Sequence, residues 1–161
     1  MALATAESIR DRIKSLLEAL TPASLASTKF RQFRNEDGAD FDEWAEKNPA
    51  AALRRFQVRE VGDDELPETS SGIEERVRVR YELRMAYPQT HKYGPANGMD
   101  RDDVMNQDWK AINYAVGIYG GANFTSTYDA IPLGATKSRE QGGKIDYLVV
   151  MLDLEYLRSV A

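Results

Sequence analysis

The most constraining feature of the sequence is a run over residues 75–87 in which apolar and charged side chains alternate. It reads ERVRVRYELRMAY, so that valine, tyrosine, leucine and methionine share one face. Four arginines, which we call the arginine face, share the other: Arg76, Arg78, Arg80 and Arg84. This period of two predicts a β-strand with one buried side and one wet side. At roughly 3.3 Å per residue it would span about 40 Å, so we expect it to bend at a bulge or to extend beyond its sheet.

Other segments carry weaker or shorter strand patterns. Residues 145–156 (IDYLVVMLDLEY) alternate in the same way, and Asp153 and Glu155 lie on one face. This spacing favours cross-strand ion pairs with arginine. The segments 28–34, 53–61 and 128–136 are shorter candidates, and Pro132 places the last of them at a sheet edge or a bulge. The chain therefore contains enough strands for one sheet.

Three segments have the signals of helices. Residues 9–20 carry an apolar stripe, and residues 40–48 and 100–119 begin at aspartates with an acid three residues later, as in a capping box. The order of elements predicts an α+β fold in a single domain, 1–161. We expect a single antiparallel β-sheet flanked by an N-terminal helix and a mid-chain helix, with helices on one side. Long irregular loops are expected at 62–72, 88–99 and about 120–128.

Composition excludes much catalytic chemistry. The 161 residues include no cysteine and one histidine, His91. Because His91 is a single histidine in a predicted loop, we expect it to lie at the surface. The motifs of phosphate loops, dinucleotide sites, calcium loops and zinc proteases do not occur. Four aspartates could suggest a metal cluster, but they fall in a helix whose first turns favour acids, so we expect capping and solvation: Asp100, Asp102, Asp103 and Asp108. We therefore predict no catalytic, cofactor-binding or metal-binding residue, no cofactor and no enzyme.

The charge balance limits the kinds of partner that the chain can bind. Lysine and arginine number 21 against 26 acids, which gives a net charge of −5 without a basic arm or an acidic tail. A sequence-independent DNA binder needs a dominant positive surface, so this balance argues against one. No apolar run approaches the roughly 20 residues of a membrane span, and charges interrupt the N-terminal segment where a signal peptide would be apolar.

Three interpretations of the arginine face remain open. It could form a phosphate groove, although it lacks aromatic residues on which bases stack. It could pair within the chain, with Glu82, Asp153 and Glu155 as acceptors. It could also form a subunit interface, because the planar fork of arginine suits bidentate contacts with a neighbour. The acids of the neighbour would then come from the segment 63–65: Asp63, Asp64 and Glu65.

The order of these elements resembles the tail terminator proteins of tailed bacteriophages. The resemblance covers roughly residues 6–157. It rests on the strand ERVRVRYELRMAYP, the helix start DRDDVMNQDWKAI and the final strand IDYLVVMLDLEYL, and on the junction from Tyr87-Pro88 through a loop to Asp100. Proteins of this family have an α+β fold. They lack known catalytic residues and cofactors.

The resemblance implies a structural protein of the virion. Such proteins form a hexameric ring that caps the tail tube, ends its polymerisation and docks to the head connector or stopper protein. The expected partners are copies of this chain, the tube protein and the connector, with DNA passing only through the lumen and no membrane. Assembly would occur in the host cytoplasm. The alternatives are another head–tail completion protein or tail tube subunit and, in another class, a small nucleic-acid-binding module that uses the Arg76–Arg84 face.

Overall fold

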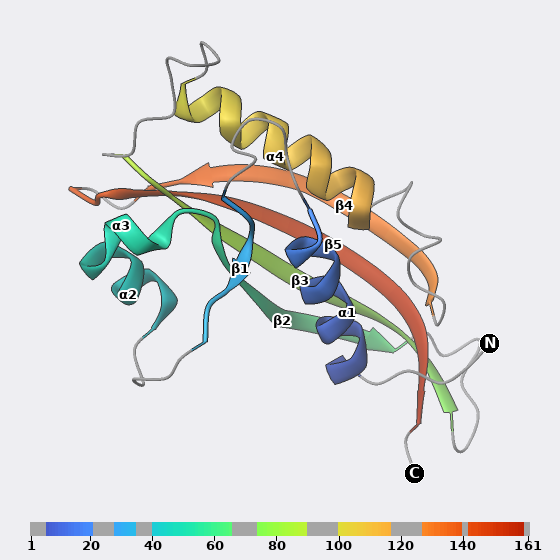
Figure 1. Ribbon diagram of the computed structural model, residues 1–161. Coiled ribbons are helices and arrows are strands. Elements are labelled where there is room, and N and C mark those ends of the chain that lie inside the picture. Colours follow the sequence, from blue (N-terminus) through green and yellow to red (C-terminus); the bar gives the residue numbers. More distant parts are fainter. Residues whose placement is uncertain are drawn as a thin grey trace.

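The centre of the fold is a β-sheet built on the two strands with the longest alternation. The computed structural model describes residues 6–20, 28–34, 40–65, 74–89, 100–116, 127–139 and 142–159. In these ranges the sheet has five strands in the spatial order β1-β2-β3-β5-β4 (Figure 1). Their bounds are β1 Arg31–Gln32, β2 Arg55–Glu65, β3 Glu74–Pro88, β4 Thr127–Ser138 and β5 Ile145–Ser159.

The α+β prediction is confirmed, with one correction to the sheet. Strands β2 to β5 pair antiparallel, but β1 lies parallel to β2, so the sheet is mixed rather than wholly antiparallel. A parallel pair requires a crossover connection, which is usually helical. Two short helices, α2 Phe41–Lys47 and α3 Pro49–Ala52, lie in the connection from β1 to β2 and make this crossover possible.

The long strand β3 is neither bulged nor left unpaired at its ends, so both expectations for it were wrong. It pairs with β5 from Glu74 opposite Ser159 to Pro88 opposite Ile145, without a register shift. The strand is tolerated at this length because β5 is equally long and the two curve together, as twisted sheets do (Figure 1). The bulge lies in β2 instead, between Glu60 and Gly62.

The main core lies between one face of the sheet and two helices, α1 Ala6–Glu18 and α4 Arg101–Val116. The apolar stripe of α1 is buried there through Ile9, Ile13 and Leu17. The sheet contributes the apolar face of β3 and its counterpart on β5: Val77, Val79, Tyr81, Leu83, Met85, Tyr87, Leu148, Val150, Leu152, Leu154 and Tyr156. The alternation in the sequence therefore predicted which side of each long strand is buried.

The opposite face is covered at one end by α2 and α3, so the expectation of helices on one side was wrong. Figure 1 shows both helices at the end of the sheet where β3 finishes and β5 begins. A second core cluster forms there around Phe41 and Ala45 of α2. The sheet side of this cluster consists of Ala86, Ile145 and Tyr147, which interrupt the charged pattern with apolar surface that must be buried.

The edge strand β4 shows how the sheet ends. Pro132 lies in it beside a register shift between Pro132 and Gly134, which confirms the prediction of an edge or bulged strand. Missing backbone donors and bulges both discourage pairing with another strand. Among the helices that the structure describes, none is both long and apolar enough to span a membrane.

Candidate functional site

The arginine face forms a ladder of ion pairs with β5. Arg76 and Arg78 both reach Glu155, with Nη2 at 2.9 Å from Oε2 and at 2.6 Å from Oε1, respectively. The Nε of Arg78 also donates to Oε1 at 3.1 Å. The registers Arg78–Glu155 and Arg80–Asp153 place these side chains directly opposite each other on neighbouring strands. The prediction of cross-strand pairing is therefore confirmed for this part of the chain.

Within the ladder the guanidinium groups lie outside and the carboxylates beneath them. Arg80 binds Asp153 through Nε at 2.9 Å and Nη2 at 3.2 Å. The Arg80 side chain keeps 49% of its surface exposed while that of Asp153 keeps 8%. The hydrogen bond from Arg78 lowers the pKa of Glu155 and outweighs the burial that would raise it, with further help from Arg76. The ladder thus presents charged donors to solvent over ionised acids.

Arg84 has a different environment from the other three arginines. Its guanidinium binds Asp42 of α2, with Nε at 2.8 Å and Nη2 at 2.7 Å from the two carboxylate oxygens. It also lies over the Tyr147 ring, 4.2 Å from the ring centroid. Because α2 packs on this end of the sheet, Arg84 is mostly buried. The arginine face therefore divides into a covered end at Arg84 and a more exposed end at Arg76, Arg78 and Arg80.

The acidic segment 63–65 lies in a strand rather than in the expected loop 62–72. It forms the end of β2, where Asp63, Asp64 and Glu65 pair with Val79, Arg78 and Val77 of β3. The backbone register thus places Asp64 beside Arg78 of the same chain. The bulge at Glu60 and Gly62 lets β2 continue past the turn-forming glycine. The arginine face and the acidic segment are therefore neighbours within one subunit.

A buried ionic network joins α4, β3 and the start of β2. Arg54 donates to Asp108 through Nε at 2.9 Å and Nη2 at 2.7 Å, and both side chains are fully buried. The hydroxyl of Tyr87 donates to the same carboxylate at 2.6 Å. Burial raises the pKa of Asp108, and the hydrogen bonds from Arg54 and Tyr87 act against that rise.

Arg54 has an unusual backbone as well as a buried charge. Its φ is 57°, in the left-handed region that residues with a side chain rarely adopt. The conformation is held because its amide donates to Ala86 O, its carbonyl accepts from Arg31, and its Nη1 donates to Thr28 O at 2.7 Å. Strained residues of this kind persist where their surroundings determine them and often mark functional regions.

The prediction of capping and solvation is confirmed for three of the four aspartates, including the exposed Asp102, and is wrong for Asp108. Asp100 and Asp103 form the reciprocal capping box, and Asp102 pairs with Lys137. Asp108 instead lies inside the core, on the stripe that also holds Val104 and Ile112. The signal was present in the sequence, because an acid at helical spacing between apolar residues lies on the buried side.

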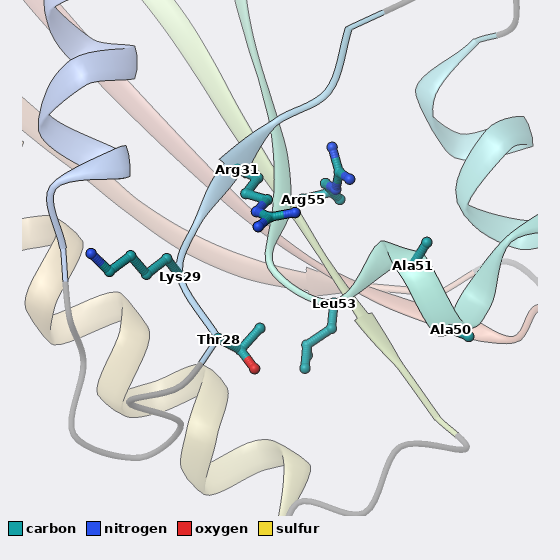
Figure 2. Close-up of a pocket in the computed structure, with 7 residues that line it drawn as sticks. All are labelled: Thr28, Lys29, Arg31, Ala50, Ala51, Leu53 and Arg55. Atoms are coloured by element: carbon teal, nitrogen blue, oxygen red, sulfur yellow. The ribbon is translucent and has the colours of Figure 1, made fainter.

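A shallow hollow lies next to the strained residue, where β1 meets β2 and α3 (Figure 2). Its volume is about 520 Å³. The lining combines three basic residues with small and apolar ones: Thr28, Lys29, Arg31, Ala50, Ala51, Leu53 and Arg55. No motif in the sequence pointed to it, because its residues come from two segments separated by the crossover.

The two tryptophans of the chain are partly buried. Trp44 packs against the second core cluster and Trp109 against the main one. The described residues do not include His91, the loop 88–99 beyond Gln89 or most of the loops at 62–72 and 120–128.

No protein-family model matches the chain, and a search of curated proteins finds no match. Function must therefore be argued from the residues themselves.

Proposed function

We propose that the chain is a structural subunit of a phage neck. In this role it forms a ring of six copies that caps the tail tube, ends its polymerisation and docks to the head connector. Two kinds of support exist. The first is the resemblance noted in the sequence, and the described helices and strands from α1 to β5 occur in the order predicted for this chain. The second is the composition of one exposed face, described next.

The observation that carries the proposal is the more exposed end of the arginine face. Arg76, Arg78 and Arg80 lie side by side over buried carboxylates of β5, so each guanidinium is held in place before any partner binds. A donor that is already ordered loses little conformational entropy on association. Arginine is also enriched at protein interfaces. These features suit a surface whose function is contact.

The acidic segment 63–65 fits the proposal in a modified form. A closed ring uses two different patches on each subunit, one facing each neighbour. Because the register places Asp64 of β2 opposite Arg78 of β3, an interface built along these two strands includes an acidic position as well as basic ones. We therefore expect a neighbouring subunit to contact the strip formed by β2 and β3 with a mixed surface, rather than an acidic loop meeting a separate basic face.

The nucleic-acid alternative has less support. A phosphate-binding groove needs positive charge in excess, whereas Arg76, Arg78, Arg80 and Arg84 each have a carboxylate within 4.0 Å. A titration with single-stranded DNA at rising salt separates the two functions. A steep loss of affinity with salt that depends on these arginines would favour the nucleic-acid module.

The decisive experiment for the ring is light scattering combined with negative-stain microscopy on the purified chain and on chain mixed with tail tubes. We expect particles of about 110 kDa, since six subunits of 18.1 kDa form the proposed ring. The variant Arg80→Glu should abolish them while circular dichroism stays unchanged. Lys110→Glu, an exposed charge reversal on α4, is the matched control. The proposal would be contradicted if the chain stayed monomeric both alone and when mixed with tail tubes. It would also be contradicted if the two variants changed ring formation equally.

A further inference from the structure

Two neighbouring arginines, Arg31 of β1 and Arg55 of β2, have no acid partner among the residues that the structure describes. Eight arginines in the described ranges form an ion pair with a carboxylate: Arg54, Arg59, Arg76, Arg78, Arg80, Arg84, Arg101 and Arg139. Four other described arginines form no ion pair with the carboxylates of those ranges, although the chain has a net charge of −5: Arg10, Arg31, Arg34 and Arg55. Of these four, Arg31 and Arg55 line the hollow beside β1.

The geometry places these two positive charges next to each other. Arg31 and Arg55 are register partners in the parallel pair of β1 and β2. Neighbouring strands lie about 4.8 Å apart, and like charges at paired positions oppose each other. Figure 2 shows the two side chains beside each other, whereas Lys29 extends away from them. A bound anion would convert this repulsion into two attractive contacts.

Contacts with neighbouring residues hold Arg31 and Arg55 in place. The guanidinium of Arg55 lies over the Trp44 ring, 5.5 Å from its centroid, which leaves the N–H groups in its plane available to an acceptor. The segment that precedes β1 is fixed by the buried Arg54, which binds Thr28 O and accepts from the amide of Arg31. Rigid support of this kind reduces the entropy lost on binding.

We propose that Arg31 and Arg55 bind a phosphate-type oxyanion in this hollow. Two planar forks offer more donors than the two oxygens of one carboxylate use, whereas a phosphate group presents three or four oxygens to both forks. Ala50, Ala51 and Leu53 line the remainder of the hollow and suit the carbon body of a phosphoester. The inference is independent of the proposed ring.

The test is a titration of the whole chain with inorganic phosphate at constant ionic strength, followed by NMR of arginine Nε–H groups and backbone amides. We expect saturable shifts at Arg31, Arg55 and Thr28, and none with chloride or acetate. Arg31→Gln and Arg55→Gln should each weaken binding about tenfold or more, since each removes a charge-assisted contact. Arg59→Gln, an exposed arginine on the same strand, is the matched control and should leave binding unchanged.

Several results would overturn the proposal. One is an equal set of shifts with acetate, and another is an equal loss of binding in the Arg59→Gln control. A third is a phosphate response that exists only after Glu36→Gln and Asp37→Asn, the acids that follow β1 in the sequence, because it would show that those acids occupy the arginines. Arg31→Lys keeps the charge and guards against a folding artefact, and it should retain weaker binding. A short single-stranded oligonucleotide forms a second arm. Binding to it as well as to phosphate assigns the site to a nucleic-acid backbone, and binding to phosphate alone assigns it to a small phosphoester.

Discussion

The Arg54–Asp108 pair and the Arg80–Asp153 pair have the same chemistry and opposite surroundings. In each, one guanidinium contacts both oxygens of one carboxylate through Nε and Nη2. In the first pair neither side chain is exposed, whereas Arg80 is half exposed. A buried charge that loses its partner cannot return to water, so the first pair holds the fold together. The second pair leaves a positioned guanidinium at the surface, where it can contact another molecule.

The largest effect is expected when the buried pair is broken. Asp108→Ala leaves the Arg54 guanidinium uncompensated in the core and also removes the acceptor of Tyr87. We expect the free energy of unfolding to fall by about 3–5 kcal/mol, measured by urea denaturation. The control is Asp102→Ala, which removes an exposed acid of the same helix. A loss as small as that of the control would show that the network does not stabilise the fold.

A smaller loss is expected from the hydroxyl of Tyr87. Tyr87→Phe keeps the ring in the core and removes only the 2.6 Å donor to Asp108. Hydrogen bonds to charged groups contribute about 2 kcal/mol, so we expect a loss of that order in the same urea measurement. The control is Tyr114→Phe, because Tyr114 is 69% exposed on the same helix that holds Asp108. Equal losses for both variants would contradict a role for the network.

The ladder should contribute less because its arginines remain hydrated. Glu155→Gln removes the carboxylate that binds Arg76 and Arg78, and we expect a loss of about 1 kcal/mol in the free energy of unfolding. Raising the salt concentration should reduce the difference, whereas the effect of Asp108→Ala should stay nearly constant. Equal salt dependence of the two variants would remove the contrast between the surface ladder and the buried network.

The ladder should also respond to acid. The pKa of Glu155 is lower in the folded chain than its ordinary value of 4.5, so the unfolded chain binds more protons in this range. Its contribution to stability is therefore present above that value and is lost as the pH falls through the lowered pKa. The difference in unfolding free energy between wild type and Glu155→Gln should narrow between pH 6 and pH 3. A constant difference would contradict the lowered pKa.

The smallest effect, and one of opposite sign, is expected at the edge pair. Arg31→Gln removes one of two like charges at paired positions, so the chain without phosphate should gain about 0.5 kcal/mol in stability or lose none. Thermal unfolding in phosphate-free buffer checks this. Adding phosphate should raise the unfolding temperature of the wild type more than that of Arg31→Gln, because the variant binds phosphate more weakly. A clear destabilisation in phosphate-free buffer would contradict the repulsion between the two arginines.

Much of the sheet could be predicted because its signal is local. Alternation over residues 75–87 and 145–156 sets which side chains share a face, and that assignment holds over 77–87 of β3 and 148–156 of β5. The capping box at Asp100 and Asp103 was likewise readable, because its hydrogen bonds connect residues three apart. The parallel pairing of β1 with β2 could not be predicted, since it depends on how the crossover through α2 and α3 packs.

The candidate sites likewise combine features that the sequence predicted with features that depend on tertiary packing. The sequence by itself determined that arginines alternate along β3 and that acids alternate along β5, which makes ion pairing between the strands possible. Only the tertiary structure decided that Arg84 is covered by α2, that Arg54 and Asp108 meet across 54 positions, and that Arg31 lies beside Arg55. The physical reason is that a period of two specifies a face, whereas the meeting of distant side chains depends on strand register and helix packing.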